Sequence, residues 1–321
     1  MSPQTTFDRF KALVEKSNRV LILLHLYPDG DTIASSLALA DYLKSQGKAV
    51  DCAAKEEIPE AFRFLPGSDE IKNDFLLGDY DLVIAVDCGD AFRTGFPLRL
   101  EQIPKSTPFV NIDHHPRNNL HKIARVNIID EKASAAAEII WDLFKFFGAK
   151  IDSKIATYIL AGIYFDTGGF QHSNVTTKTL EVISECLRLG GRIALISSHI
   201  GGSKSSAGLR LWGVALKRMR LNQMGVVSSM LTLEDLKSCQ AKAEDASGVV
   251  NLINSVPQAK LSILFLETPG GKIKASIRTE SDQVDVAKFA RLFGGGGHKK
   301  AAGFTVEGRL VEKAGNWKIE S

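Results

Sequence analysis

Four short segments place histidine and aspartate close together: "HLYPDGD", "AVDCGD", "NIDHH" and "GIYFDTGGF". Carboxylates and imidazoles without thiolates suit hard or borderline divalent ions, with Mn²⁺ favoured and Mg²⁺ or Co²⁺ also suited. Several carboxylates in one crevice would repel one another strongly if no cation lay between them. The candidate residues, in chain order, are His25, Asp29, Asp31, Asp87, Asp113, His114, His115 and Asp166.

This set offers more ligands than one ion needs. It therefore predicts two divalent ions about 3.5–4 Å apart, bridged by a carboxylate. Such ions would turn a bound water into a hydroxide nucleophile for attack on a phosphoester. Each segment alone has an ordinary structural interpretation. "PDGD" is a common turn sequence, a single aspartate can cap a helix, and two histidines can simply be solvated. The joint occurrence of all four, each at the end of a regular element, favours the metal site.

Strands and helices alternate in the part of the chain that would position these residues. Strands are expected in residues 19–25, 48–54, 81–90 and 108–115, and helices in 32–47, 133–148, 152–165 and 174–191. Such alternation is typical of an α/β domain with a mainly parallel, doubly wound sheet. Ligands of open sheets collect outside the carboxyl ends of the strands. Three segments should therefore face one crevice, and Asp166 could reach it from a helix end.

The chain is long enough for two domains, and its composition changes near residue 200. With 321 residues it exceeds the usual size of one compact domain. A Gly- and Ser-rich stretch predicts a flexible connector at 191–210, between a catalytic metal-binding domain at 1–190 and a smaller α+β domain at 211–321. Residues 1–200 hold 22 Lys and Arg against 26 Asp and Glu, whereas residues 201–321 hold 18 against 11. This asymmetry suits a half that holds cations and a half that receives phosphates.

The segment "FGGGGHKK" is the main candidate for binding in the second domain. Consecutive glycines expose backbone N–H groups and allow a phosphate or nucleotide to approach closely. Without context, the same run could be only a flexible turn between a helix and a strand. The candidate residues are Gly294, Gly295, Gly296, Gly297 and His298.

Composition also limits the class of protein. Since no apolar segment reaches the roughly 20 residues of a membrane helix and the N-terminus lacks signal-peptide features, we expect a cytoplasmic protein without membrane partners. The four cysteines lie far apart, which argues against a zinc ribbon and against a disulfide framework.

The order of these motifs resembles the DHH phosphoesterase family, particularly its NrnA-like group with a DHHA1 domain. The resemblance rests on "HLYPDGDTIAS", "VDCGD", "DHHPRNN", "ASAAAE", "AGIYFDTGGFQHSNVTT" and "RLFGGGGHKKAAGF". It implies one metal held by His25, Asp29 and Asp87. It implies a second metal held by Asp31, Asp87, His114 and Asp166. Thr32, Ala34 and Phe165 depart from the usual pattern without removing a ligand.

The resemblance also implies roles in catalysis and substrate binding. His115 would lie near the scissile phosphate, with Asp113 behind it holding an imidazole, while Arg278, the glycine run and His298 would bind the nucleotide end. The implied substrates are short RNA or DNA oligonucleotides, dinucleotides such as pApA or pGpG, and 3′-phosphoadenosine 5′-phosphate. Other activities left open are hydrolysis of cyclic-di-AMP or linear dinucleotides, family II pyrophosphatase, long-strand exonuclease, and non-catalytic nucleotide binding. The oligomeric state, including a homodimer, is also open.

Overall fold

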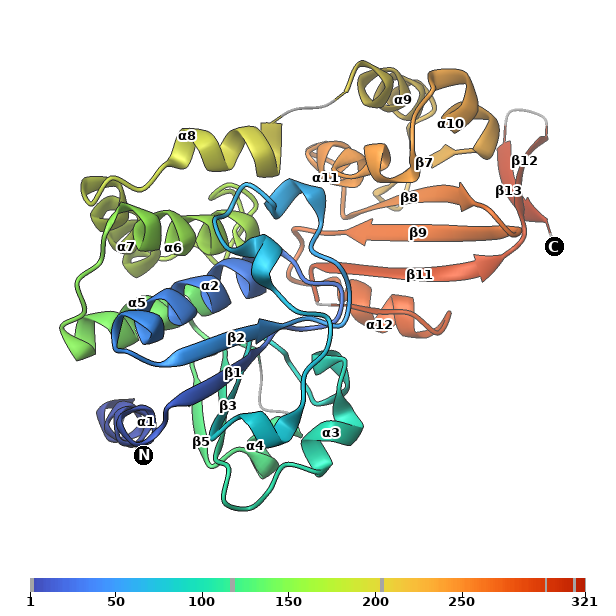
Figure 1. Ribbon diagram of the computed structural model, residues 1–321. Helices are drawn as coiled ribbons and strands as arrows, with labels where there is room; N and C mark the ends of the chain where they lie inside the picture. Colours follow the sequence, from blue (N-terminus) through green and yellow to red (C-terminus); the bar gives the residue numbers. More distant parts are fainter. Residues whose placement is uncertain (1–2, 116–118, 203–204, 298, 314–315, 321) are drawn as a thin grey trace. The chain divides into compact units, whose positions relative to one another are not determined.

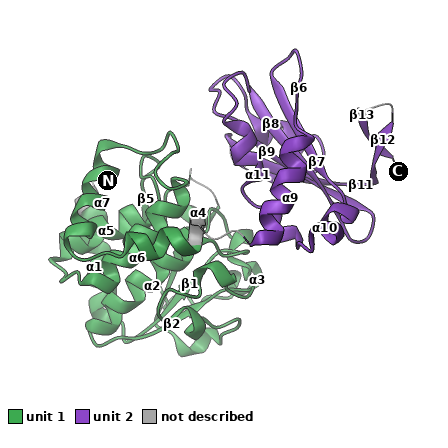
Figure 2. Ribbon diagram, turned by 90° about the horizontal axis from the view of Figure 1, so that it is seen from above, with its two compact units in different colours: residues 1–203 green, residues 204–321 purple. Residues whose placement is uncertain are grey.

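The computed structural model describes residues 3–115, 119–202, 205–297, 299–313 and 316–320. The chain forms two compact units, Met1–Ser203 and Lys204–Ser321 (Figure 2). Residues 191–210, predicted to be a flexible connector, span the division between the units. Most of their described part is helical: α8 (Ile193–Ile196), the π-helical turn η5 (Ser197–Gly202) and the start of α9 (Ser206–Lys217). The Gly- and Ser-rich composition is therefore compatible with helical backbone here.

A five-stranded parallel sheet forms the centre of the first unit (Figure 1), as predicted for an α/β domain. The strand order is β2-β1-β3-β4-β5. All five residues of β3 and of β4 are buried, because parallel sheets are covered on both faces. The strands are β1 (Arg19–Leu23), β2 (Ala49–Ala53), β3 (Leu82–Val86), β4 (Phe109–Asp113) and β5 (Val126–Ile129).

Side chains of β1 alternate between two hydrophobic cores. Val20 and Ile22 pack in the larger core with α1, α2, α5, α6 and α7, whereas Leu21 and Leu23 pack in a smaller one with α3 and α4. Successive strand residues point to opposite faces, so the sheet is covered on both sides. The helices are α1 (Pro3–Lys16), α2 (Gly30–Ser45), α3 (Pro97–Glu101), α4 (Leu120–Ile123), α5 (Ala136–Phe147), α6 (Ser153–Asp166) and α7 (Thr177–Arg188).

The second unit is an α+β fold around a six-stranded mixed sheet of order β10-β11-β9-β8-β7-β6. Its one parallel pair among the described strands is β7 with β8, and a separate hairpin pairs β12 with β13. The strands are β6 (Arg220–Leu221), β7 (Val226–Leu231), β8 (Leu261–Thr268), β9 (Lys272–Arg278), β10 (Gly296–Gly297), β11 (Ala301–Glu307), β12 (Arg309–Lys313) and β13 (Asn316–Glu320). The helices are α9, α10 (Leu233–Cys239), α11 (Val249–Asn254) and α12 (Val286–Arg291).

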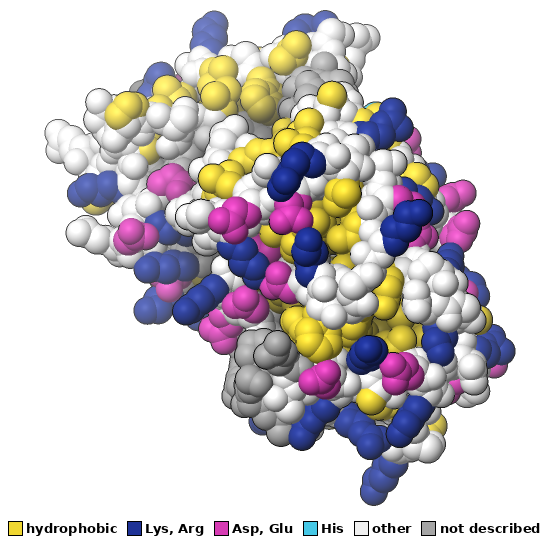
Figure 3. Space-filling view, turned by 90° about the vertical axis from the view of Figure 1, so that its left-hand side faces the viewer, with side chains coloured by type: hydrophobic (Ala, Val, Ile, Leu, Met, Phe, Trp, Pro, Cys, Tyr) yellow, Lys and Arg dark blue, Asp and Glu magenta, His cyan; other side chains and the backbone are white. Residues whose placement is uncertain are grey.

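Sequence patterns missed several short elements, including β5, α10, α11 and the β12–β13 hairpin. These segments are seven residues or shorter, so their periodicity is too brief to identify. Among the described residues, no helix is both long and apolar enough to cross a membrane. Charged side chains of both signs are interspersed on the face drawn in Figure 3, as on an ordinary solvated surface.

Candidate metal centre

The loop after β1 orients His25 toward two carboxylates. Nδ1 of His25 lies 2.7 Å from the carbonyl oxygen of Leu26, to which it can donate a hydrogen bond. Nε2 then faces Oδ1 of Asp29 at 3.4 Å and Oδ2 of Asp87 at 3.8 Å. A backbone acceptor at one ring nitrogen leaves the other with a lone pair, which is the arrangement of a metal-ligating histidine.

Asp29, in the "PDGD" segment, is both a helix cap and a candidate metal ligand. It is the N-cap of α2, and its Oδ1 accepts hydrogen bonds from the backbone N–H groups of Asp31 (3.1 Å) and Thr32 (3.2 Å). The cap fixes the carboxylate near His25. The helix start and the candidate ligand are therefore the same residue.

Asp31 is fully buried in the first turn of α2 and is held on several sides. Its Oδ1 accepts hydrogen bonds from Ser35 Oγ (2.8 Å) and the backbone N–H of Ala137 (3.0 Å), while Oδ2 accepts from the N–H of Ala136. The two amides belong to the first turn of α5, which favours a nearby negative charge. The carboxylate of Asp31 is thus fixed by its own helix and by α5.

Asp87 follows the last residue of β3 and lies in the left-handed region, with φ of 60°. This conformation costs about 1–2 kcal/mol for a non-glycine residue, and such strain gathers at functional sites. The carboxylate is 2% exposed. Its two oxygens face different partners: Oδ2 faces His25, whereas Oδ1 lies 3.3 Å from both His114 Nε2 and His115 Nδ1.

The end of β4 supplies two imidazoles with different surroundings. His114 Nδ1 lies 3.3 Å from the carbonyl oxygen of Ala133, and its Nε2 lies 3.2 Å from Oδ2 of Asp166. Asp113 Oδ1 accepts from the backbone N–H of His115 (2.9 Å) and lies 2.8 Å from its Nδ1. The imidazole that Asp113 holds is therefore that of His115, whereas a backbone carbonyl orients His114.

Asp166 is the last residue of α6, and its position depends on Asn174. The Nδ2 of Asn174 donates hydrogen bonds to the carbonyl oxygens of Asp166 (3.2 Å) and Ser134 (3.0 Å). Nδ1 of His172 lies 3.2 Å from the same Asp166 carbonyl. The segment after α6 therefore ties the helix end to the residues that precede α5.

In the part of the chain that the structure describes, three groups of side chains have ligand atoms within 4.8 Å of one another and could each hold a metal ion. His25 Nε2 and Asp87 Oδ1 are buried, yet neither makes a hydrogen bond among the described residues. Orphaned buried polar atoms are rare, and a bound cation would satisfy both. The residues therefore fit a metal centre. The groups are His25–Asp29–Asp87, Asp31–His114–Asp166 and Asp87–His114–His115.

The pKa values of several cluster residues are shifted because these groups are buried and their charges lie close together. Burial, with the charges of Asp87 and Asp166, raises the pKa of Asp31 well above its usual range, and burial raises the pKa of Asp166 to about 6. Burial opposes protonation of the two histidines, but neighbouring carboxylates raise the pKa of His114 to about 12 and that of His115 to about 9. The same imidazoles hold the pKa of Asp87 below its usual range despite burial. Carboxylates crowded in this way favour a bound cation.

Both units resemble parts of known proteins. Residues 19–163 match the model of the DHH family N-terminal domain, and residues 225–316 match the DHHA1 domain. The chain is 31% identical to the bifunctional oligoribonuclease and PAP phosphatase NrnA of Thermus thermophilus over 92% of this chain and 86% of that protein. The chain belongs to the DHH phosphoesterase family.

Solved structures of the DHH fold are also similar. An exopolyphosphatase-related protein from Bacteroides fragilis has a TM-score of 0.85 and 27% identity, with 94% of this chain and 91% of that chain covered. RecJ of Thermus thermophilus, solved with Mn²⁺, has a TM-score of 0.53 and 14% identity, covering 95% of this chain and 52% of RecJ. This second likeness concerns the fold alone.

In the DHHA1 unit, strand register places Arg278 near the glycine run. Arg278, at the end of β9, pairs with Ala301 of β11, and Gly297 of β10 pairs with Ala302. Arg278 is half-buried; its Nη1 donates to the carbonyl oxygen of Ile277 (2.9 Å), and burial lowers its pKa. The predicted binding residue His298 lies outside the described residues.

Close packing against β11 also requires glycine at positions of this run. A Cβ on Gly295 would lie 2.2 Å from the carbonyl oxygen of Gly303, and one on Gly297 would lie 2.4 Å from that of Ala301. Gly294 has a φ of +73°, and Gly296 belongs to β10 with Gly297. Part of the run is thus a strand packed tightly on β11 and not only a flexible turn.

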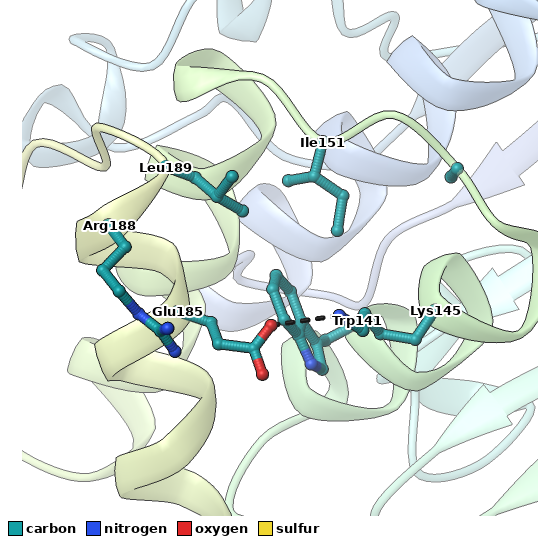
Figure 4. Close-up of a pocket in the computed structure, with 7 residues that line it drawn as sticks. Trp141, Lys145, Ile151, Glu185, Arg188 and Leu189 are labelled. Atoms are coloured by element: carbon teal, nitrogen blue, oxygen red, sulfur yellow. Dashed lines mark hydrogen bonds and ion pairs between the residues drawn. The ribbon is translucent and has the colours of Figure 1, made fainter.

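A hollow elsewhere on the DHH unit contains none of the candidate ligands. It lies between α5 and α7, where the ammonium of Lys145 reaches Glu185 at 3.0 Å (Figure 4). Lys145 also lies 5.4 Å from the ring centre of Trp141. The candidate site therefore lies at the strand ends, not in this hollow.

Two sets of supporting groups were not predicted from the sequence. Ser35 and the N-terminal amides of α5 hold Asp31, while Asn174 holds the end of α6. Ser35 lies in "HLYPDGDTIAS", the α5 amides in "ASAAAE" and Asn174 in "QHSNVTT". The sequence patterns therefore contained these residues but gave no role for them. Only the packing of α5 and α6 against α2 reveals those roles.

Proposed function

We propose that the protein is a metal-dependent phosphoesterase that hydrolyses short phosphorylated nucleotides. The observation that carries the proposal is the convergence of His25, Asp29 and Asp87 beside Asp31, His114 and Asp166. Family membership supports it, and so does the 31% identical relative, which is named an oligoribonuclease and PAP phosphatase. Short RNA or DNA, dinucleotides such as pApA and pGpG, and 3′-phosphoadenosine 5′-phosphate are the substrates we infer.

In this proposal, the first ligand group and the second would each hold one divalent ion, with Mn²⁺ preferred. When bound, the pair supplies positive charge to the phosphate oxygens and lowers the pKa of a coordinated water. Asp87 is suited to bridge them, since its Oδ2 faces His25 and its Oδ1 faces His114. Asp29 is fixed as the N-cap of α2, and Asp31 is fixed by α5. Both carboxylates would therefore need little rearrangement when the metal ions bind.

His115 would stabilise charge or transfer a proton at the scissile phosphate. Asp113 supports this role because it contacts both the backbone and the ring of His115, which sets the ring orientation beside Asp87. Oxygen Oδ2 of Asp113 is in turn fixed by the N–H of Gly89 at 2.8 Å. An oriented imidazole of this kind is typical of proton-transferring groups.

In the DHHA1 unit, we infer that Arg278 and the glycine run bind the nucleotide end of the substrate. A guanidinium at the end of β9 can pair bidentately with a phosphate. The backbone of the glycine run, placed two strands away by the register, allows close approach of a ligand. We include His298 in this site on the strength of the sequence pattern.

The deciding experiment compares Asp87→Asn with Asp142→Asn. Asp142 lies on α5 and pairs with Lys178 at 2.6 Å, so its substitution removes a carboxylate from the same unit but not from the cluster. Both purified variants and the wild-type protein would be assayed with Mn²⁺, Mg²⁺ or Co²⁺. The substrates would be pApA, pGpG, 3′-phosphoadenosine 5′-phosphate, cyclic-di-AMP, pyrophosphate and a long single-stranded oligonucleotide. We expect at least a thousandfold loss of kcat/KM for Asp87→Asn and little change for Asp142→Asn.

The substrate panel separates the remaining activities. Preferred turnover of cyclic-di-AMP would redefine the substrate class, whereas pyrophosphate turnover alone would indicate a pyrophosphatase. Preference for long single strands would indicate an exonuclease. A folded wild-type protein that binds nucleotides but turns over none of the panel with any metal would refute the proposal.

A further inference from the structure

A half-buried arginine lies on the loop that follows the candidate ligand Asp87. Arg93 belongs to the short 3-10 turn η4 (Phe92–Thr94), in the loop that follows Asp87. A Cβ built on Gly89 would lie 3.0 Å from Nη1 of Arg93 and 3.7 Å from Cζ, so the guanidinium packs directly on this glycine. Gly89 has a φ of +72°. The glycine therefore allows the turn and also leaves room for the guanidinium.

The backbone of Arg93 is fixed between two loops of the candidate site. Its N–H donates to Oδ1 of Asp90 at 2.9 Å, and its carbonyl oxygen accepts a hydrogen bond from the N–H of Leu26. Leu26 directly follows the candidate ligand His25, and Asp90 is three residues after Asp87. Arg93 thus joins the two loops that bring His25 and Asp87 together.

The guanidinium of Arg93 has no acceptor of its own in the part of the chain that the structure describes. It forms no ion pair or hydrogen bond there, and Asp90 contacts only the backbone N–H of Arg93. Arg99, six residues on, behaves differently: its Nη1 pairs with Asp74 and donates to the carbonyl oxygen of Phe75 at 2.7 Å. The N–H donors of the Arg93 guanidinium are therefore available to an anionic ligand.

We propose that Arg93 binds a non-bridging phosphate oxygen of the substrate next to the metal centre. The inference rests on the proposed phosphoesterase function and adds a cation that belongs to the protein itself. Arginine is suited to this role because its planar fork can donate two parallel hydrogen bonds to phosphate. Bound in this way, the guanidinium aligns the phosphate and stabilises the charge that grows on it during hydrolysis.

The test replaces Arg93 with methionine and with lysine, and uses Arg99→Met as the matched control. We expect Arg93→Met to lower kcat/KM on the best substrate by about 10²–10³-fold, as for removal of one preorganised donor. Its melting temperature should stay at the wild-type value and its Mn²⁺ affinity should not fall. Arg93→Lys should recover part of the loss, because lysine restores charge but not the bidentate geometry. Arg99→Met should lower the melting temperature and leave kcat/KM near the wild-type value.

A second measurement does not depend on turnover. Titration calorimetry of inorganic phosphate into the Mn²⁺-loaded protein should show at least tenfold weaker binding for Arg93→Met than for the wild type. Equal phosphate affinity and equal kcat/KM in the two proteins would overturn the role of Arg93 while leaving the phosphoesterase function intact. A wild-type protein without turnover would refute the function instead, and the phosphate titration would still decide whether Arg93 binds the anion.

Discussion

Gly162 allows α6 to pass close to the buried carboxylate of Asp31. A Cβ at position 162 would lie 2.6 Å from Oδ1 of Asp31 and 2.7 Å from Cβ of Ala137. Asp31 cannot simply turn away, because Ser35 and the amides of α5 hold both of its oxygens. The substitution Gly162→Ala must therefore separate α6 from α2 and α5 or displace the candidate metal ligand.

The expected magnitude follows from two opposing contributions. Overpacking a buried site by one methyl group costs about 1–3 kcal/mol, and contact on two sides places this site near the upper end. Alanine gains about 1 kcal/mol over glycine in a helix. We expect a net loss of about 2 kcal/mol, which lowers the melting temperature of a unit of this size by about 4–8 °C.

The control is Gly213→Ala. Gly213 lies in α9, is exposed, and a Cβ there would meet nothing within 4 Å. This variant should gain about 0.5–1 kcal/mol of stability. Calorimetry that resolves the two units measures both effects, and Mn²⁺-dependent turnover should fall only for Gly162→Ala. A Gly162→Ala variant as stable and as active as the wild type would show that α6 does not pack tightly on Asp31.

Three further outcomes are expected. Each Mn²⁺ ion bound at 100 times its Kd should stabilise the DHH unit by about 2.7 kcal/mol. The calorimetric transition of this unit should therefore rise while that of the DHHA1 unit should not, and equal shifts would contradict a metal centre confined to the DHH unit. Burial would raise the pKa of Asp235, but Arg218 outweighs it and holds this pKa below its usual range. The stability lost in Asp235→Asn should therefore be largest above about pH 5 and should shrink as the pH falls below about 4. A loss of stability that does not depend on pH in denaturant titrations would contradict this. Tyr158→Phe removes a hydrogen bond of 2.6 Å to the carbonyl oxygen of Pro66 and should cost about 1 kcal/mol in urea unfolding, with turnover unchanged.

Much of the DHH fold could be read from the chain because its long elements have clear periodicity. The strand "RVLIL" and the helix "GDTIASSLALADYLKS" occur where the pattern predicts them. Segments of four to seven residues, such as β5 and α11, carry too few residues to show a period. Their conformation depends on pairing and packing with distant parts of the chain.

The candidate ligands were also visible in the sequence, since carboxylates and imidazoles at strand ends indicate divalent-ion chemistry. The sequence alone could not show how each side chain is held. The two amides that hold Asp31 are more than 100 residues away from it. Likewise, the identity of the imidazole held by Asp113 depends on the backbone at the end of β4.

The sequence by itself predicted the types of candidate ligand, the alternation of strands and helices and a division into two parts, because these follow from residue types and local periodicity. The tertiary structure decided which carboxylates face one another, the left-handed backbone at Asp87, and the arginine packed on Gly89. The facing carboxylates Asp31, Asp87 and Asp166 belong to segments far apart in the chain. Arg93 and Gly89 are close in sequence, but the loop that holds them is fixed by the hydrogen bond between Arg93 and Leu26 of another loop. Such contacts form only when strands and helices pack together, so no local pattern specifies them.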